Sequence, residues 1–156
     1  LTDPGPLAIF LYTNKFYDLI KSKLNKNGIV TLHTETPYMV DKIHIRIIKT
    51  LMKSFKYVQH YYNYIPIYGT IMGFALCSNK KPLVTKKIFE KRIKKIRKLK
   101  MFNYDSYMSM RNIPKYVIEQ LKNKGNKIIT EKSVIKDYEE LDSVELKIEK
   151  RLEKSS

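Results

Sequence analysis

The stretch from Tyr61 to Asn79 constrains the fold most, because it is the longest run without a charged side chain. Its length alone would suit a membrane-spanning helix. It also contains Asn63, Pro66 and the glycines Gly69 and Gly73, which interrupt a helix. A run rich in tyrosine and isoleucine around a Pro and Gly connection predicts a strand, a turn and a second strand instead.

The residues before this hairpin alternate between helix-like and strand-like patterns. Apolar positions at helical spacing predict helices over 13–24, which Thr13 can cap, and over 42–55. Further runs predict strands over 29–34, 57–62 and 72–77. The turn-forming run DPGP at 3–6 follows the expected end of an earlier strand at 1–2. This order predicts an α/β fold, half of a doubly wound sheet that ends in an antiparallel hairpin.

The character of the chain changes after residue 80. We expect a basic amphipathic helix over 85–98 with Ile88, Phe89, Ile93 and Ile96 on one stripe, and a second helix over 114–122. Between them, 101–110 is expected to be irregular and aromatic, and 127–130 to be a short strand or arm. A charged amphipathic helix is predicted from 137 onward. We therefore divide the chain into a half α/β domain (1–79), a helical segment (80–130) and a charged helical tail (131–156).

Positive charge is concentrated in the helical segment. The chain carries a formal net charge of +16, and residues 80–100 contain eleven basic side chains against Glu90 alone. Such a run raises nucleic acid as a partner. The basic residues are nearly all lysine, however, whereas base recognition favours arginine forks and aromatic platforms, for which the sequence shows no pattern. We interpret the run as a solvated lysine-rich face, with nucleic acid as the less favoured partner.

Few classes of catalytic centre fit this sequence. Cys77 is the single cysteine, which excludes an intrachain disulfide and favours a reducing, cytoplasmic location. His44 and His60 have no partner at metal-ligand spacing, so no metal is expected. None of the five glycines forms a G-x-G motif, so no dinucleotide cofactor is expected either. No nucleophile elbow supports covalent catalysis.

A doubly wound sheet holds its ligand at the carboxyl ends of its strands. The corresponding loops, 3–7, 33–37 and 65–69, contain Asp3, Glu35, His33 and Tyr68. Carboxylates and a phenol without a metal set suit a cationic ligand. The structural alternative is a turn aspartate that caps a helix, a surface glutamate and a core tyrosine, and topology alone favours that alternative.

Several short blocks resemble one known family. They are LTDPGP at 1–6, LYT at 11–13, FY at 16–17, GI at 28–29, TETP at 34–37, IPIY at 65–68 and GF at 73–74, followed by FEKRI at 89–93, YD at 104–105, IP at 113–114 and IIT at 128–130. Each block is short, but as an ordered set they resemble the C-terminal half of the polyamine aminopropyltransferases, the spermidine and thermospermine synthase family.

The resemblance implies a Rossmann-like sheet of the class I methyltransferase type. It also implies transfer of an aminopropyl group from decarboxylated S-adenosylmethionine to a diamine or polyamine such as putrescine. The donor sulfonium leaves as a neutral thioether, so the demanding tasks are to deprotonate and aim the attacking amine. In the family motif D-x-[ST]-D-P two carboxylates perform them. Asp3 matches the second, and the first, the base, would fall immediately before Leu1.

Eight residues are assigned to substrates by the resemblance. The amine would contact Asp3, Glu35, Tyr68 and His33, and the donor would contact Leu1, Thr2, Pro6 and Leu7. His33 stands where the family commonly has glutamine, and a charged imidazole at acid pH would oppose a polyamine. Two other departures are a missing residue between Pro4 and Gly5, relative to D-P-x-G-P, and Ile67 in place of a hydroxyl residue.

The family's N-terminal β-rich region, its glycine-rich donor turn and its ribose-binding acid have no match in this sequence. We therefore expect the isolated chain to be inactive, as a fragment or as one part of a two-chain or homo-oligomeric enzyme. Three alternatives stay open: a methyltransferase that uses S-adenosylmethionine, a basic nucleic-acid-binding module, and a vestigial half that stabilises a complete partner.

Overall fold

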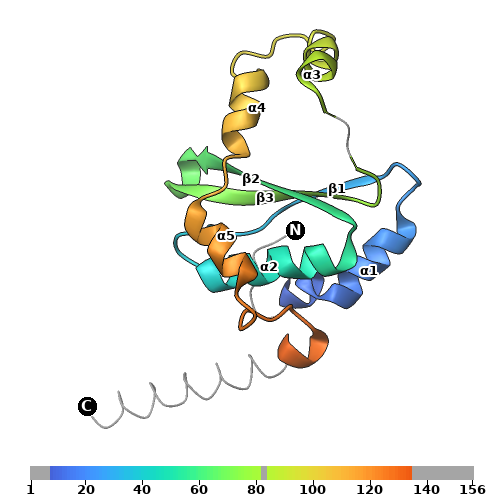
Figure 1. Ribbon diagram of the computed structural model, residues 1–156, viewed down its shortest axis with the longest axis vertical. Coiled ribbons are helices and arrows are strands. Elements are labelled where there is room, and N and C mark those ends of the chain that lie inside the picture. Colours follow the sequence, from blue (N-terminus) through green and yellow to red (C-terminus); the bar gives the residue numbers. More distant parts are fainter. Residues whose placement is uncertain (1–7, 82–83, 135–156) are drawn as a thin grey trace.

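A three-stranded sheet forms the centre of the protein in the computed structural model, which describes residues 8–81 and 84–134 (Figure 1). The strands are β1 (Ile29–His33), β2 (Tyr57–Ile65) and β3 (Thr70–Ser78). β3 lies in the middle and pairs antiparallel with both neighbours, so β1 and β2 run parallel to each other. This arrangement follows from the connections, because β1 and β2 are joined by a helical crossover and β2 and β3 by a short turn.

The predicted hairpin is confirmed, and it is longer than expected. β2 and β3 stay paired out to Ile65 and Thr70 and are joined by the 3₁₀ turn η2 (Pro66–Tyr68) and Gly69. Pro66 lies in the connection, where its missing N–H costs no ladder hydrogen bond. Gly69 has a φ of +61°, a left-handed conformation that favours glycine.

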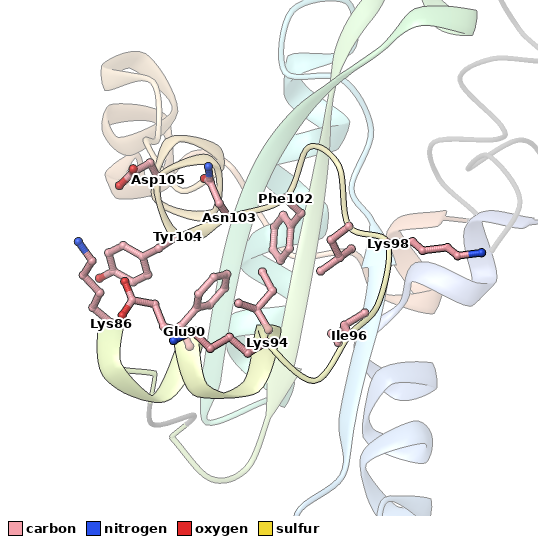
Figure 2. Close-up of a pocket in the computed structure, with 12 residues that line it drawn as sticks. Lys86, Glu90, Lys94, Ile96, Lys98, Phe102, Asn103, Tyr104 and Asp105 are labelled. Atoms are coloured by element: carbon pink, nitrogen blue, oxygen red, sulfur yellow. The ribbon is translucent and has the colours of Figure 1, made fainter.

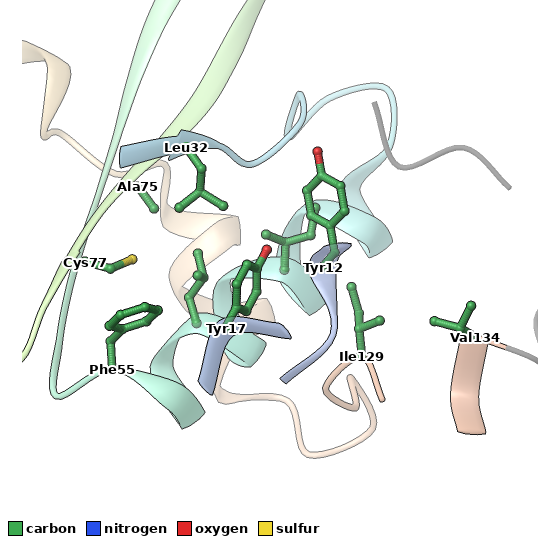
Figure 3. Close-up of a cluster of buried hydrophobic side chains, with 10 residues drawn as sticks. Tyr12, Tyr17, Leu32, Phe55, Ala75, Cys77, Ile129 and Val134 are labelled. Atoms are coloured by element: carbon green, nitrogen blue, oxygen red, sulfur yellow. The ribbon is translucent and has the colours of Figure 1, made fainter. Parts of the chain in front are cut away.

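Two helices cover one side of the sheet, α1 (Asn14–Lys23) after the 3₁₀ turn η1 (Ala8–Tyr12), and α2 (Asp41–Ser54) (Figure 1). Thr13 caps α1 as predicted, since its Oγ1 accepts a hydrogen bond from the Phe16 N–H at 3.3 Å. α2 supplies Ile47 and Leu51 to the main core. Figure 3 shows that core, whose buried members also include Tyr12, Tyr17, Leu32, Phe55, Ala75, Cys77, Ile129 and Val134.

The helices after residue 80 differ from the expectation in two places. α3 (Lys86–Ile93) ends five residues before the predicted boundary, and Ile96, expected on its apolar stripe, is 58% exposed. The segment expected to be irregular contains α4 (Tyr104–Met110), because Asn103 and Ser106 form a capping box at its start. α5 (Lys115–Lys122) is confirmed. Residues 127–130 form no strand, so the arm is the correct alternative, and Ile129 anchors it in the core.

The α/β class is therefore confirmed for the described residues. The strand expected at 1–2 and the helix expected from 137 onward lie outside them. No helix in the described part of the chain is long and apolar enough to cross a membrane.

Candidate functional site

The loop after β1 is tied to β3 by a short backbone bridge. The Thr34 N–H donates to the Gly73 carbonyl at 2.7 Å, and the Gly73 N–H donates to the Glu35 carbonyl at 2.9 Å. Glu35 has a φ of +66°, a left-handed backbone that non-glycine residues seldom adopt. The bridge holds this conformation and fixes where the Glu35 side chain leaves the end of the sheet.

Glu35, His33 and Tyr12 lie in a row at this end of the sheet. Oε1 of Glu35 is 3.3 Å from Nδ1 of His33, and the side chains are only 12% and 17% exposed. Nε2 of His33 is 3.2 Å from the hydroxyl of Tyr12, a fully buried residue of η1. A carboxylate so shielded from water gains strongly from a cationic partner. The arrangement can therefore bind a cation beside Glu35.

A buried histidine supports the loop from behind. His44 of α2 is fully buried, and burial lowers its pKa, so the ring is neutral. Its Nδ1 lies 2.6 Å from the Thr34 carbonyl, to which it donates, and its Nε2 lies 3.0 Å from the Tyr62 hydroxyl, from which it accepts. Burial also raises the pKa of Tyr62, so the phenol keeps its proton. His44 thus positions Thr34, and through it Glu35.

His60 lies close to the same ring system. It is buried, and burial together with the nearby His44 lowers its pKa to about 4. Both histidines are therefore uncharged at neutral pH. Within the described ranges, no group of three or more His, Cys, Asp or Glu side chains could hold a metal ion.

Tyr68 lies at the tip of the hairpin and is 66% exposed, so the alternative of a core tyrosine is wrong. The hairpin tip and the Glu35 loop are neighbours, because Thr36 Oγ1 and Thr70 Oγ1 are 3.3 Å apart. The structure thus brings Glu35 and His33 into contact and places Tyr68 on an adjacent loop. Asp3, Leu1, Thr2, Pro6 and Leu7 lie outside the described residues.

Sequence reasoning missed three residues that shape the site, Tyr12, His44 and Gly73. Tyr12 and Gly73 belong to blocks that carried the resemblance. Their roles in the site could not be predicted, because they depend on contacts between segments that are distant in the sequence. His44 showed a usable signal, because it lies at helical spacing from the buried residues Ile47, Ile48 and Leu51 of α2.

Residues 1–88 match the model of the spermine/spermidine synthase domain family. A polyamine aminopropyltransferase of Nitrosomonas europaea is 37% identical over 79 residues, which cover 51% of this chain and 24% of the relative. One from Aeropyrum pernix is 29% identical over 130 residues, which cover 78% of this chain and 41% of the relative. The chain spans less than half the length of these relatives.

Solved structures show the same fold. A spermidine synthase in complex with the transition state analogue AdoDATO superposes with a TM-score of 0.67 at 20% identity, over 78% of this chain and 42% of the other. Spermidine synthase from Thermotoga maritima gives a TM-score of 0.62 at 19% identity, over 71% and 38% of the two chains. With more than half of its residues matched by the family model, this chain belongs to the spermine/spermidine synthase family.

Proposed function

We propose that this chain forms the amine-binding part of an aminopropyltransferase site that acts on a diamine or polyamine, with decarboxylated S-adenosylmethionine as donor. The observation that carries the proposal is the shielded Glu35 carboxylate, held at the end of the sheet by a strained backbone and faced by His33. Such strain persists where the surrounding structure enforces it, commonly at binding sites. A carboxylate of this kind matches the ammonium group of a polyamine.

The reaction divides the work between groups. The amine nitrogen attacks the carbon next to the sulfonium, the carbon–sulfur bond breaks with its electron pair moving to sulfur, and the nitrogen loses a proton to a base. The resemblance puts that base before Leu1, so this chain's described residues bind and orient the amine. Glu35 would hold a distal ammonium, and Tyr68 would contact the acceptor from the hairpin tip.

Related proteins support this assignment at the level of the family. The matched relatives are polyamine aminopropyltransferases, and one similar structure holds a transition state analogue. Asp3 and the donor contacts Leu1, Thr2, Pro6 and Leu7 remain part of the proposal on the strength of their motif positions.

The family's N-terminal portion would complete the site, as part of the same polypeptide or as a partner chain. Among the described strands, β1 and β2 are each hydrogen-bonded on one side only, to β3. An edge strand offers unpaired N–H and C=O groups to a further strand. We place the sheet of the N-terminal portion along the edge of β1, and we expect residues 1–156 alone to be inactive.

The test is to co-express the chain with the N-terminal part of the Nitrosomonas europaea relative and to measure spermidine formed from putrescine and decarboxylated S-adenosylmethionine. We expect product from the co-purified pair and none from either part alone. In the pair, Glu35→Gln should raise the KM for putrescine roughly ten- to hundredfold, because a charged hydrogen-bond partner is lost. Glu119→Gln, an exposed carboxylate of α5, is the matched control and should change nothing.

Two results would contradict the proposal. One is a stable pair that binds the donor but forms no product from any diamine or polyamine. The other is a pair in which Glu35→Gln and Glu119→Gln behave alike. Methyl transfer from ordinary S-adenosylmethionine by the same pair would favour the methyltransferase alternative.

A further inference from the structure

Helices α3 and α4 and their connection project from the sheet on the side opposite α1 and α2 (Figure 1). We call residues 86–111 the basic hairpin. No residue of α3 is buried. All eleven basic side chains between 80 and 100 are exposed, and none forms an ion pair with another described residue. The hairpin is therefore a strongly positive surface, in which Glu90 and Asp105 are the two acidic side chains.

Aromatic side chains from both helices of the hairpin meet around one ring. The Phe89 centroid lies 5.6 Å from that of Phe102, 5.5 Å from that of Tyr104 and 5.1 Å from that of Tyr107. Cations lie on this cluster, with Lys86 Nζ 5.6 Å from the Tyr104 centroid and Arg111 Cζ 5.0 Å from that of Tyr107. The chain thus gathers π faces and positive charge from segments that are separate in sequence.

An open pocket of about 390 Å³ lies against this cluster (Figure 2). Its walls include Phe89, Phe102 and Tyr104. The charged side chains that line it are Lys86, Lys94, Lys98, Glu90 and Asp105. Phe102 is 40% exposed, so one aromatic side chain remains available to a ligand. The volume falls in the range of small-ligand sites and would accept a flat ring such as a nucleobase.

We infer that the basic hairpin binds single-stranded nucleic acid without sequence preference. The lysines would contact backbone phosphates, and Phe102 would stack on a base, the combination that characterises single-strand binding surfaces. From the sequence, the scarcity of arginine made a nucleic acid the less favoured partner. That scarcity argues only against recognition of specific bases. An anionic membrane is the poorer match, because α3 has eight residues, too few for a long interfacial face.

The experiment measures fluorescence anisotropy of a labelled oligouridine and a labelled oligothymidine, each of about 20 nucleotides, titrated with the full chain. Lys86→Gln, Lys94→Gln and Lys98→Gln together should weaken binding roughly tenfold or more and make the slope of log affinity against log salt shallower by about 2. The matched control is Lys21→Gln, Lys23→Gln and Lys26→Gln, which removes the same charge from exposed positions in and after α1. The control should leave both quantities nearly unchanged.

Phe102→Leu separates stacking from charge, because it keeps an apolar side chain and removes the ring. We expect it to weaken oligonucleotide binding roughly fivefold or more and to leave heparin binding unchanged. Equal effects of the two lysine triples, or no effect of Phe102→Leu, would overturn the inference. Binding to phosphatidylserine vesicles but to neither oligonucleotide would overturn it in favour of a membrane. Circular dichroism of each variant checks that the hairpin still folds.

Discussion

A Cβ atom added at Gly73 would stand 2.6 Å from Cε1 of the His44 ring. It would also stand 2.6 Å from Thr34 Oγ1 and 2.9 Å from the Glu35 carbonyl oxygen. The absence of a side chain at Gly73 is therefore what lets β3 approach α2 and the Glu35 loop together. This glycine is conformationally ordinary, and its requirement is one of space.

Gly73→Ala should lower the free energy of unfolding by about 3 kcal/mol, because neither the buried ring nor the backbone carbonyl can move away cheaply. The measurement is urea unfolding followed by circular dichroism. Gly125→Ala is the control, since the nearest atom there is the side-chain oxygen of Asn123 at 3.2 Å. Its effect should stay within about 0.5 kcal/mol. Equal losses from both variants would contradict the close packing at Gly73.

The order of elements as far as the β2–β3 hairpin was predictable, because each strand and helix has its own hydrophobic periodicity. The structure differs from the prediction where local interactions determine the secondary structure. α4 depends on a capping box between Asn103 and Ser106, within a segment whose aromatic residues suggested irregular structure. The Glu35 site was only partly predictable, because its shape depends on the close packing of Gly73 in β3, His44 in α2 and the Glu35 loop. Single-residue patterns do not report such contacts.

Stability should fall on acidification because of His60. Its pKa is lowered from 6.5 to about 4 in the folded chain, chiefly by burial. The unfolded chain therefore binds a proton more readily, so stability is full above about pH 6.5 and is lost as the pH falls toward about 4. The largest loss of unfolding free energy from this protonation is about 3 kcal/mol. Urea unfolding of the wild type at several pH values between these limits measures it.

His60→Phe isolates this contribution from other titrating groups. Neither ring nitrogen of His60 has a hydrogen-bond partner in the described structure, so a phenyl ring loses none and can keep the edge contact with Tyr62. The difference in unfolding free energy between the variant and the wild type should grow in favour of the variant as the pH falls. A difference that is constant with pH would refute the prediction.

Thr50 should anchor the arm that carries Ile129. Its Oγ1 accepts the buried Ile129 N–H at 2.8 Å and donates to the Arg46 carbonyl at 2.6 Å. Thr50→Val keeps the shape but leaves that N–H unsatisfied, so it should cost about 1–3 kcal/mol and speed hydrogen exchange at the Ile129 amide. Thr50→Ser keeps the hydroxyl and should preserve slow exchange. Fast exchange in both variants would argue against the hydrogen bond.

His33 should make the proposed amine site sensitive to acid. A protonated imidazole 3.3 Å from the Glu35 carboxylate would offset the negative charge that attracts an ammonium group. In the assembled pair we therefore expect the KM for putrescine to rise about tenfold on acidification, equivalent to ~1.4 kcal/mol. His33→Gln cannot gain this charge and should show a much flatter profile.

The donor supplies the internal control for this prediction. Decarboxylated S-adenosylmethionine is assigned to residues 1–7 and to the partner, so its KM should follow the same pH profile in the wild type and in His33→Gln. Because Glu35 is the group that a charged His33 masks, Glu35→Gln should also flatten the putrescine profile, but at a uniformly higher KM. If His33→Gln retains the full acid sensitivity for putrescine, another group titrates and the imidazole has no part in amine binding.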